Sequence, residues 1–432
     1  MRADTAGPDT AGPLIASPGW RYAVICGLYA YQGLVAGFAI TAVPNHYAAM
    51  GATAAAVGAH VATVGLPWIL QPLWGPVVDR FGGFAMGKRR FWVVTALVLS
   101  LLALARLLLV EDESVAGLPL VSAVFLVQSA FAALTDTATD GMIIDNVPAE
   151  RLGTANAVTR VGFVCGTALG AALFAWMLPV HGLHASAVVL LAIGVLALLL
   201  PLLVRERAED AVLSLRPAPA RVAGETLLQL LRRLAASFSG GTTLILLAIC
   251  FATDYAGALF RLPLTVELIQ HRGWEAEALS RFQAVTALVT GTVGAMLVGW
   301  WTDREGTSRA LAILLALCAV SHVGAAALLL LSDPRWAAMA GPLALGLSTV
   351  MPALLFVALA PAVMQASLGP AAATRFALFM ASLNMGDVAG SAMSGQVSAA
   401  VGLPVVGLAA GGAFGLLALL SRLGAARRLG LS

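Results

Sequence analysis

Charged residues are scarce in this sequence. Only 11% of its 432 residues are Asp, Glu, Lys or Arg, and Lys88 is the one lysine. Apolar residues make up 60%, and the mean hydropathy is +0.90. Soluble domains carry about 25% charged residues. The composition therefore excludes an ordinary soluble domain and favours a protein that crosses a membrane many times.

Cysteine is also rare, and sequence motifs for bound nucleotides or metals are missing. The four cysteines all fall within apolar runs, so we expect small buried side chains rather than disulfides or metal ligands: Cys26, Cys165, Cys250 and Cys318. The chain has no P-loop, zinc-ligand spacing, nucleophile elbow or nucleic-acid motif. We expect no catalytic residue, no metal, no cofactor and no nucleic-acid partner.

Long apolar runs fill most of the chain. A helix needs about 20 mostly apolar residues to span a bilayer. The runs are continuous rather than alternating, which favours helices over a barrel. We predict an all-α membrane protein of twelve transmembrane helices, at 22–49, 54–78, 91–110, 118–146, 154–178, 185–204, 241–269, 277–301, 310–331, 336–365, 373–400 and 403–421.

The positive charges predict the orientation. If the N-terminus is cytoplasmic, 19 of the 25 Lys and Arg residues fall in cytoplasmic segments. Lys and Arg are enriched in the cytoplasmic loops of membrane proteins. We expect a multi-pass protein of the bacterial inner membrane with both termini in the cytoplasm.

The predicted helices divide the chain into two halves of six. We expect a disordered tail over 1–21 without signal-peptide features, a first bundle over 22–204 and a second over 241–422, with a tail over 423–432. A linker over 205–240 joins the halves. Its 222–238 stretch has an apolar stripe opposite Arg232 and Arg233, which suits a helix lying on the membrane surface.

Three carboxylates gather in the fourth apolar run, in the sequence LTDTATDGMIIDNV. Asp136 and Asp140 are four residues apart and share one helix face, whereas Asp145 lies nearer the end of the run. A charge at membrane depth costs about 3 kcal/mol or more, so such residues usually face a partner or a transport path. We predict that Asp136 and Asp140 line a path for substrate or protons, and that Asp145 is an interfacial anchor.

Further polar residues inside the apolar runs are candidates for the same path. Asp254 and Arg261 lie seven residues apart in one run and are expected to pair. The remaining candidates are Tyr29, Tyr31, Gln32, Arg160, Asn384 and Asp387. Each candidate could instead have a purely structural role, and the tyrosines could lie at the membrane interface.

A short motif occurs twice. Gly75-x3-Asp79-Arg80-x-Gly82 follows the second predicted helix, and Gly299-x3-Asp303-Arg304-x-Gly306 follows the eighth, 224 residues later. This spacing indicates an internal repeat of two six-helix halves. We expect Gly75 and Gly299 to allow close helix approach, and Asp79, Arg80, Asp303 and Arg304 to form gating contacts.

The doubled motif resembles that of the major facilitator superfamily. The run D-x3-D-x4-D-x2-P-A-E-R from Asp136, together with Tyr29-x2-Gln32-Gly33, is similar to one branch of it. That branch holds muropeptide permeases, acetyl-CoA transporters and siderophore importers, and the resemblance covers residues 25–170 best. It implies two pseudo-symmetric bundles around a central pocket. Where that branch has a basic residue after Gly-aromatic in the fifth helix, this chain has Val164, and Arg160 is a possible substitute.

These observations predict a secondary transporter for an organic solute. Without a nucleotide site, active transport would draw on an ion gradient, and buried acids are suited to carry protons. We expect a monomer in the lipid bilayer that takes up a small solute with protons by alternating access. The alternatives are an exporter of the same fold, a non-transporting receptor, or a membrane prenyltransferase with Asp136-x3-Asp140 as half of a magnesium site.

Overall fold

The computed structural model is built almost entirely from long helices. It describes residues 17–81, 84–147, 152–207, 209–216, 229, 232, 241–330, 334–367 and 372–422. Within these ranges, ten helical stretches are long and apolar enough to cross a membrane. One of them, α7 (Leu152–Leu203), bends at Gly182 and supplies two passes, and α14 (Ala372–Val401) adds another. The twelve-helix fold class is thus confirmed.

The first half of the chain holds six passes, several of which are interrupted. They are made of α1 (Pro18–Gly37), the π-turn η1 (Phe38–Ala42), α2 (Val43–Ala49), α3 (Ala54–Ile69), the 3₁₀ turn η2 (Gln71–Leu73), α4 (Trp74–Arg80), α5 (Arg90–Ala105), η3 (Arg106–Leu109), η4 (Val115–Gly117), α6 (Leu118–Asn146) and α7. The helix breaks between α3 and α4, just after Pro67 and at Pro72. Each proline removes a helical hydrogen bond, which explains the break.

The second half repeats this order. Its passes are α9 (Gly241–Gln270), α10 (Ala276–Val289) continued by η6 (Thr290–Gly294) and α11 (Ala295–Glu305), α12 (Thr307–Leu329), α13 (Pro334–Ser367), α14 and α15 (Leu403–Arg422). Residues 1–16 and 423–432 of the expected tails, and nearly all of the amphipathic helix expected at 222–238, lie outside the described residues. Residues 18–21, which we placed in the disordered tail, instead form the start of α1. The domain boundaries therefore stay predictions.

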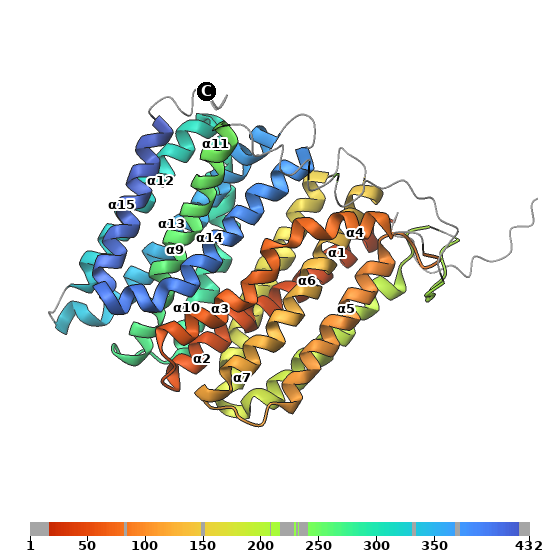
Figure 1. Ribbon diagram of the computed structural model, residues 1–432, viewed down its shortest axis with the longest axis horizontal. Helices are drawn as coiled ribbons and strands as arrows, with labels where there is room; N and C mark the ends of the chain where they lie inside the picture. Colours follow the sequence, from red (N-terminus) through yellow and green to blue (C-terminus); the bar gives the residue numbers. More distant parts are fainter. Residues whose placement is uncertain are drawn as a thin grey trace, which may run out of the picture.

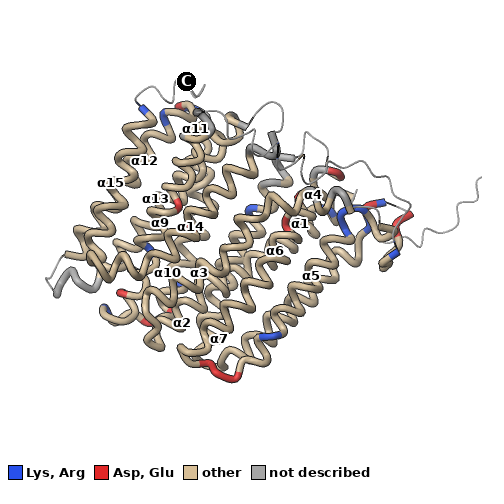
Figure 2. Tube along the Cα trace, viewed as in Figure 1, with Lys and Arg blue, Asp and Glu red and all other residues tan. Residues whose placement is uncertain are grey.

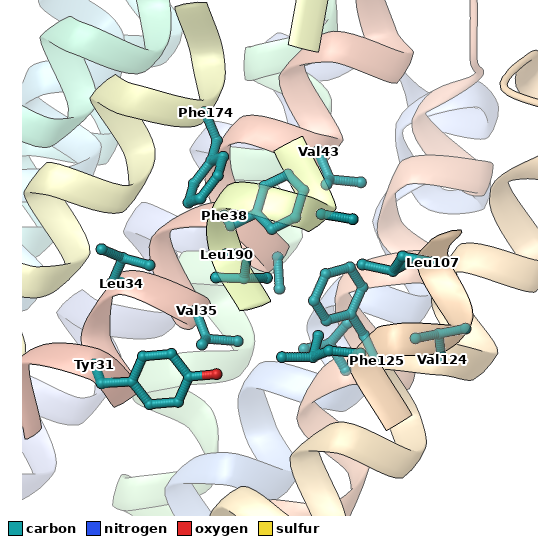
Figure 3. Close-up of a cluster of buried hydrophobic side chains, with 14 of the residues drawn as sticks. Tyr31, Leu34, Val35, Phe38, Val43, Leu107, Val124, Phe125, Phe174 and Leu190 are labelled. Atoms are coloured by element: carbon teal, nitrogen blue, oxygen red, sulfur yellow. The ribbon is translucent and has the colours of Figure 1, made fainter. Parts of the chain in front are cut away.

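Each half has its own apolar core. In Figure 1 the two halves stand side by side, the first in red to yellow and the second in green to blue. The first core surrounds Phe38, whose ring lies 4.3 Å from that of Phe174 and 5.7 Å from that of Phe125 (Figure 3). The second core runs from Leu246 to Ala418.

Within each half, glycines bring one pair of helices into backbone contact, and the two pairs occupy equivalent places in the two halves. A Cβ atom added at Gly166 of α7 would lie 2.0 Å from the Ala30 carbonyl oxygen of α1. In the second half, a Cβ at Gly386 of α14 would lie 2.2 Å from the Phe251 carbonyl oxygen of α9. Small residues at such positions allow membrane helices to pack with their backbones close together.

The bend in α7 is capped from a distant loop. Gly182 has φ of +77°, a conformation that favours glycine. The Glu113 carboxylate accepts hydrogen bonds from the Leu183 and His184 amides, at 3.0 and 3.4 Å, which begin the second half of α7. Glu113 thus satisfies amides that a helix start leaves unpaired.

The cysteines differ in burial. Cys165, which we expected to be buried, is exposed, whereas Cys250 and Cys318 are buried.

Most of the hydrogen bonds between described residues of the two halves lie at one end of the helices. We call it the Asn45 end, where α2 and the starts of α3 and α10 lie, and we call the opposite end, with α4 and the end of α11, the Lys88 end (Figure 1). Asn45 donates to Ser280 Oγ at 2.7 Å and to Gln283 Oε1 at 2.8 Å. Gln270 donates to the Ala48 and Ala52 carbonyls, both at 2.8 Å.

One further hydrogen bond joins the halves farther from this end. Asn384 of α14 donates to the Trp68 carbonyl of α3 at 3.2 Å. Between pairs of described residues, no hydrogen bond links the halves closer to the Lys88 end than this one. A Cβ at Gly75, beyond Trp68 in the chain, would meet no atom within 4 Å. Among the described residues, the hydrogen bonds between the halves therefore lie at the Asn45 end and at the Asn384–Trp68 pair.

The glycine contacts predict a position-specific loss of stability. Gly166→Ala forces a methyl group against the Ala30 carbonyl, and we expect overpacking to cost about 1–3 kcal/mol. Thermal unfolding of the detergent-solubilised protein would measure this as a lower midpoint. Gly257→Ala in α9 is the matched control, because its Cβ would meet nothing within 4 Å. Equal midpoints for the two variants would contradict the packing account.

Candidate functional site

The Asp136 side chain faces the interior of the first half. Its Oδ1 accepts a hydrogen bond from Gln32 Nε2 of α1 at 3.1 Å, and its Oδ2 accepts one from Gln71 Nε2 of η2 at 2.6 Å. The break in the second pass therefore presents Gln71 to α6. Asp136 is half-buried and joins three passes through neutral donors.

The second carboxylate of α6 contacts the same face of α1. The Tyr29 hydroxyl donates to Asp140 Oδ1. Tyr29 and Gln32 are one helical turn apart, as are Asp140 and Asp136, so the two pairs stack in register. Figure 2 shows the acidic residues of α6 beside α1, within the first half. Asp140 itself is exposed, so it lies at an accessible part of this face.

Tyr31 is not part of this cluster, which corrects our prediction. Its side chain is only 5% exposed and packs in the first apolar core with Leu34 and Phe38 (Figure 3). Two residues along a helix correspond to about 200° of rotation, so Tyr31 points away from the face that carries Tyr29.

The second half holds a smaller charged cluster between α9 and α14. Arg261 Nη2 lies 3.5 Å from Asp387 Oδ1, and both side chains are more than one-third exposed. We expected Arg261 to pair with Asp254. Its ion pair is instead with Asp387, while Asp254 is half-buried and within electrostatic range of both. Close packing of α14 on α9 at Gly386 explains why Asp387 reaches Arg261.

Arg160 and Asn384 lie where the halves meet. The Arg160 guanidinium carbon is 5.3 Å from the centre of the Phe356 ring of α13, which fits a cation–π contact. Arg160 forms no salt bridge with any described residue. Asn384 is held by the Trp68 carbonyl, so its amide also spans the interface.

The doubled motif lies at the Lys88 end, in α4 and α11. The side chains of Asp79, Arg80 and Asp303 are outside what the structure describes, so their gating role stays a prediction. The expected close helix approach at Gly75 and Gly299 is not found: a Cβ would meet nothing within 4 Å at Gly75 and only a Val357 methyl group at 3.9 Å at Gly299. The Arg304 guanidinium lies over the Trp300 ring at 5.7 Å.

A different set of charges ties this end of the first half together. Asp145 accepts hydrogen bonds from Lys88 at 3.2 Å and Arg89 at 2.9 Å. Burial alone would raise the pKa of Asp145, but the hydrogen bonds and charges of Arg89 and Lys88 outweigh it and lower that pKa. This placement agrees with the prediction that Asp145 anchors the helix end.

Arg90 is the most deeply enclosed charge of this region, with 0% of its surface exposed. Its guanidinium donates to five backbone carbonyls, those of Met86, Pro201, Leu202, Ala211 and Val212, at 2.6 to 3.2 Å. The Glu206 carboxylate accepts the Arg89 and Arg90 amides at the start of α5. Arg90 therefore holds the end of α7 and the segment after it against the loop before α5.

A sequence model of the Major Facilitator Superfamily matches residues 25–375. The chain belongs to the major facilitator superfamily. The resemblance noted from the doubled motif is thereby confirmed. Membership agrees with the paired bundles.

Two bacterial transport proteins are similar to part of this chain. The chain is 26% identical over 266 residues to an anhydromuropeptide permease of Escherichia coli (strain K12), covering 60% of this chain and 51% of the relative. It is 29% identical over 285 residues to a gallate transporter of Pseudomonas putida, covering 60% of each. The chain thus spans about half to three-fifths of the length of these relatives.

Solved transporters share the fold over nearly the whole chain. A D-xylose–proton symporter superposes with a TM-score of 0.69 at 13% identity, covering 93% of this chain and 97% of that one. A POT family transporter in complex with a thioalcohol-conjugated peptide gives 0.71 at 10% identity, covering 96% and 98%. At such low identity these similarities show the fold alone.

Several residues that build the site were not singled out in the sequence. Gln71 donates the second hydrogen bond to Asp136. The sequence feature that could have pointed to it is a lone amide side chain between two prolines in an apolar run. Glu206 and Arg90 were counted only as loop charges. Gln270 and Gln283 were overlooked because an isolated amide near a helix end has no distinctive spacing.

The Arg90 contacts predict a strong difference between two conservative substitutions. Arg90→Lys removes the planar donor fork and leaves several buried carbonyls unpaired, so we expect a loss on the order of 3 kcal/mol in unfolding free energy. Arg309→Lys is the control, because Arg309 forms only an exposed pair with Glu305, worth about 0–1 kcal/mol. Thermal unfolding in detergent would compare them, and similar midpoints would refute the proposed clamp.

Proposed function

We propose that this protein is a proton-coupled secondary transporter that takes up an organic solute by alternating access. The observation that carries the proposal is the Asp136–Asp140 cluster. Both carboxylates lie within a membrane-spanning helix and are held by neutral donors: Gln32, Gln71 and Tyr29. Neither forms a salt bridge with a described residue. Carboxylates of this kind in membrane helices mark proton and substrate paths.

The second half supplies further acids for coupling, and Arg160 of α7, in the first half, supplies a group for substrate. Asp254 and Asp387 share the neighbourhood of one arginine, Arg261. Loss of a proton from one acid would change the competition for that guanidinium. Arg160 has an aromatic contact and no described carboxylate partner, which suits it to bind an anionic group of a solute.

The contacts between the halves support a state closed at the Asn45 end. We infer that this end faces the cell exterior, because the Lys88 end carries most of the lysine and arginine residues, as expected for the cytoplasmic side. Both termini would then be cytoplasmic, in a bacterial inner membrane. Rocking of the two bundles about the site would open the Asn45 end and close the Lys88 end.

The cargo class follows from chemistry and from the relatives' names. An anhydromuropeptide and gallate both carry carboxylate groups, and Arg160 and Arg261 are the guanidiniums within the described spans that could bind one. Muropeptide-like cargo carries carboxylates and acyl-CoA-like cargo carries phosphates, and a guanidinium can bind either group. Siderophore-like cargo is the third class that the proposal includes. We propose a transporter and not an enzyme, because the second aspartate-rich motif that a magnesium-dependent prenyltransferase requires is missing from the sequence.

Proton coupling predicts a specific failure of Asp136→Asn. In proteoliposomes with an alkaline interior, wild-type protein should accumulate a labelled anionic solute, with gallate and an anhydromuropeptide as the first probes. The variant should lose this accumulation by tenfold or more yet retain solute exchange at equal pH, because its amide cannot carry a proton. Asp112→Asn, on an exposed loop, is the control. Unchanged gradient-driven accumulation in Asp136→Asn would sink proton coupling.

Alternating access predicts that Gln270→Ala opens the Asn45 end more often. The variant loses two hydrogen bonds to Ala48 and Ala52, each worth about 0.5–1.5 kcal/mol. A loss of about 1 kcal/mol changes an equilibrium roughly fivefold. A cysteine introduced at the buried Ala48, in a background without native cysteines, should therefore react several-fold faster with a membrane-impermeant maleimide.

The control for this experiment is Gln128→Ala. Gln128 bonds Ser100 within the first bundle and does not touch the interface. Equal labelling rates for the two variants would show that the Gln270 contacts do not hold this end closed.

A further inference from the structure

The segment after α7 is fixed to the loop before α5 by its backbone. Ala211 N donates to the Ala85 carbonyl at 2.8 Å, and Ala85 N donates to the Arg216 carbonyl at 3.1 Å. Arg90 adds hydrogen bonds to the Ala211 and Val212 carbonyls. Residues 205–207 and 209–216, which we call the docked segment, therefore hold a defined position at the Lys88 end.

This fixed backbone turns its apolar side chains outward. Leu213 is 71% exposed, Leu215 is 75% exposed and Val212 is 50% exposed. They contribute nothing to either apolar core. Apolar side chains gathered on a protein surface mark contacts with a membrane or a partner.

The exposed leucines continue the membrane-facing surface of α7. One nitrogen of Arg90 binds both the Leu202 carbonyl at 3.1 Å and the Val212 carbonyl at 2.6 Å, so the end of α7 and the docked segment are adjacent. The outward residues of the last turns of α7, Leu199 and Leu203, are 45% and 54% exposed. The exposed apolar surface thus extends past the end of α7.

In the docked segment, two acidic side chains face the protein and two basic side chains face outward. Its acids Glu206 and Asp210 turn toward backbone amides: Glu206 accepts those of Arg89 and Arg90, and Asp210 accepts that of Arg207 at 2.9 Å. Burial raises the pKa of both carboxyl groups. Arg207 and Arg216 are exposed, with Glu209 as the remaining exposed acid.

We propose that the docked segment is a binding surface for anionic phospholipid headgroups. Leu213 and Leu215 insert at the acyl boundary, while Arg207 and Arg216 bind the phosphates of the same leaflet. Apolar side chains beside basic residues are the pattern by which segments at a helix end hold anionic lipid. Because Arg90 ties this segment to α5 and α7, the lipid contact anchors the first bundle and leaves the second free to move against it.

The test compares lipid binding by the full chain and its variants. Native mass spectrometry of protein extracted from mixed phosphatidylcholine and phosphatidylglycerol bilayers would count retained phosphatidylglycerol. We expect the double variant Arg207→Gln with Arg216→Gln to retain several-fold less, and Arg309→Gln, a charge loss elsewhere at the same end, to match wild type. Equal retention by all three proteins would overturn the proposal.

A second measurement tests the insertion of the leucines. A spin label on Leu213→Cys, in a background without native cysteines, should be more accessible to oxygen than to a water-soluble nickel reagent in phosphatidylglycerol-containing nanodiscs. Preferential access by nickel would place the segment in water and contradict the proposal. A change in oligomeric state on Leu213→Ser with Leu215→Ser would instead assign the surface to a second copy of the chain, and would also overturn it.

Discussion

A polar group inside a membrane must find its partner within the protein, and this constraint shapes the structure at every level. Asp136 is held by side-chain amides from two other passes, and Tyr29 serves Asp140. The π-turn in the first pass leaves the Ala39 carbonyl to accept from His60, 2.8 Å away, whose other ring nitrogen lies 2.8 Å from Ser122 Oγ. Irregular backbone is tolerated at membrane depth only where such partners exist.

The same constraint explains why the two halves differ in their charged sites. In the first half the acids project from α6 and are met by α1 and η2, so neutral donors suffice. In the second half the acids lie on α9 and α14, which glycines bring into close contact, and a guanidinium occupies the space between them. The repeated fold thus carries two different polar arrangements. A transporter of the major facilitator superfamily can use such asymmetry to separate proton handling from solute binding.

Much of the fold could be predicted from the sequence, because continuous apolar runs and a doubled motif are local signals. The apolar runs identified the passes, and the doubled motif identified the two halves. Side-chain direction was less accessible. Tyr31 and Tyr29 look equivalent in the sequence, yet their positions on the helix send one into the core and the other to Asp140. Arg261 pairs with Asp387 rather than Asp254. Asp387 lies on another helix, and residue spacing within one helix cannot reveal such a contact.

The hydrogen bonds that join described residues of the two halves at the Asn45 end involve uncharged groups: amides donate to a hydroxyl, to an amide oxygen and to backbone carbonyls. Separating them would carry no net charge through the electric field of the membrane. A charge that does cross that field exchanges about 2.3 kcal/mol with it per 100 mV. In the proposed cycle, the membrane voltage would therefore act on the steps that move protons, solute or the guanidiniums, while the opening of this end would be electrically silent.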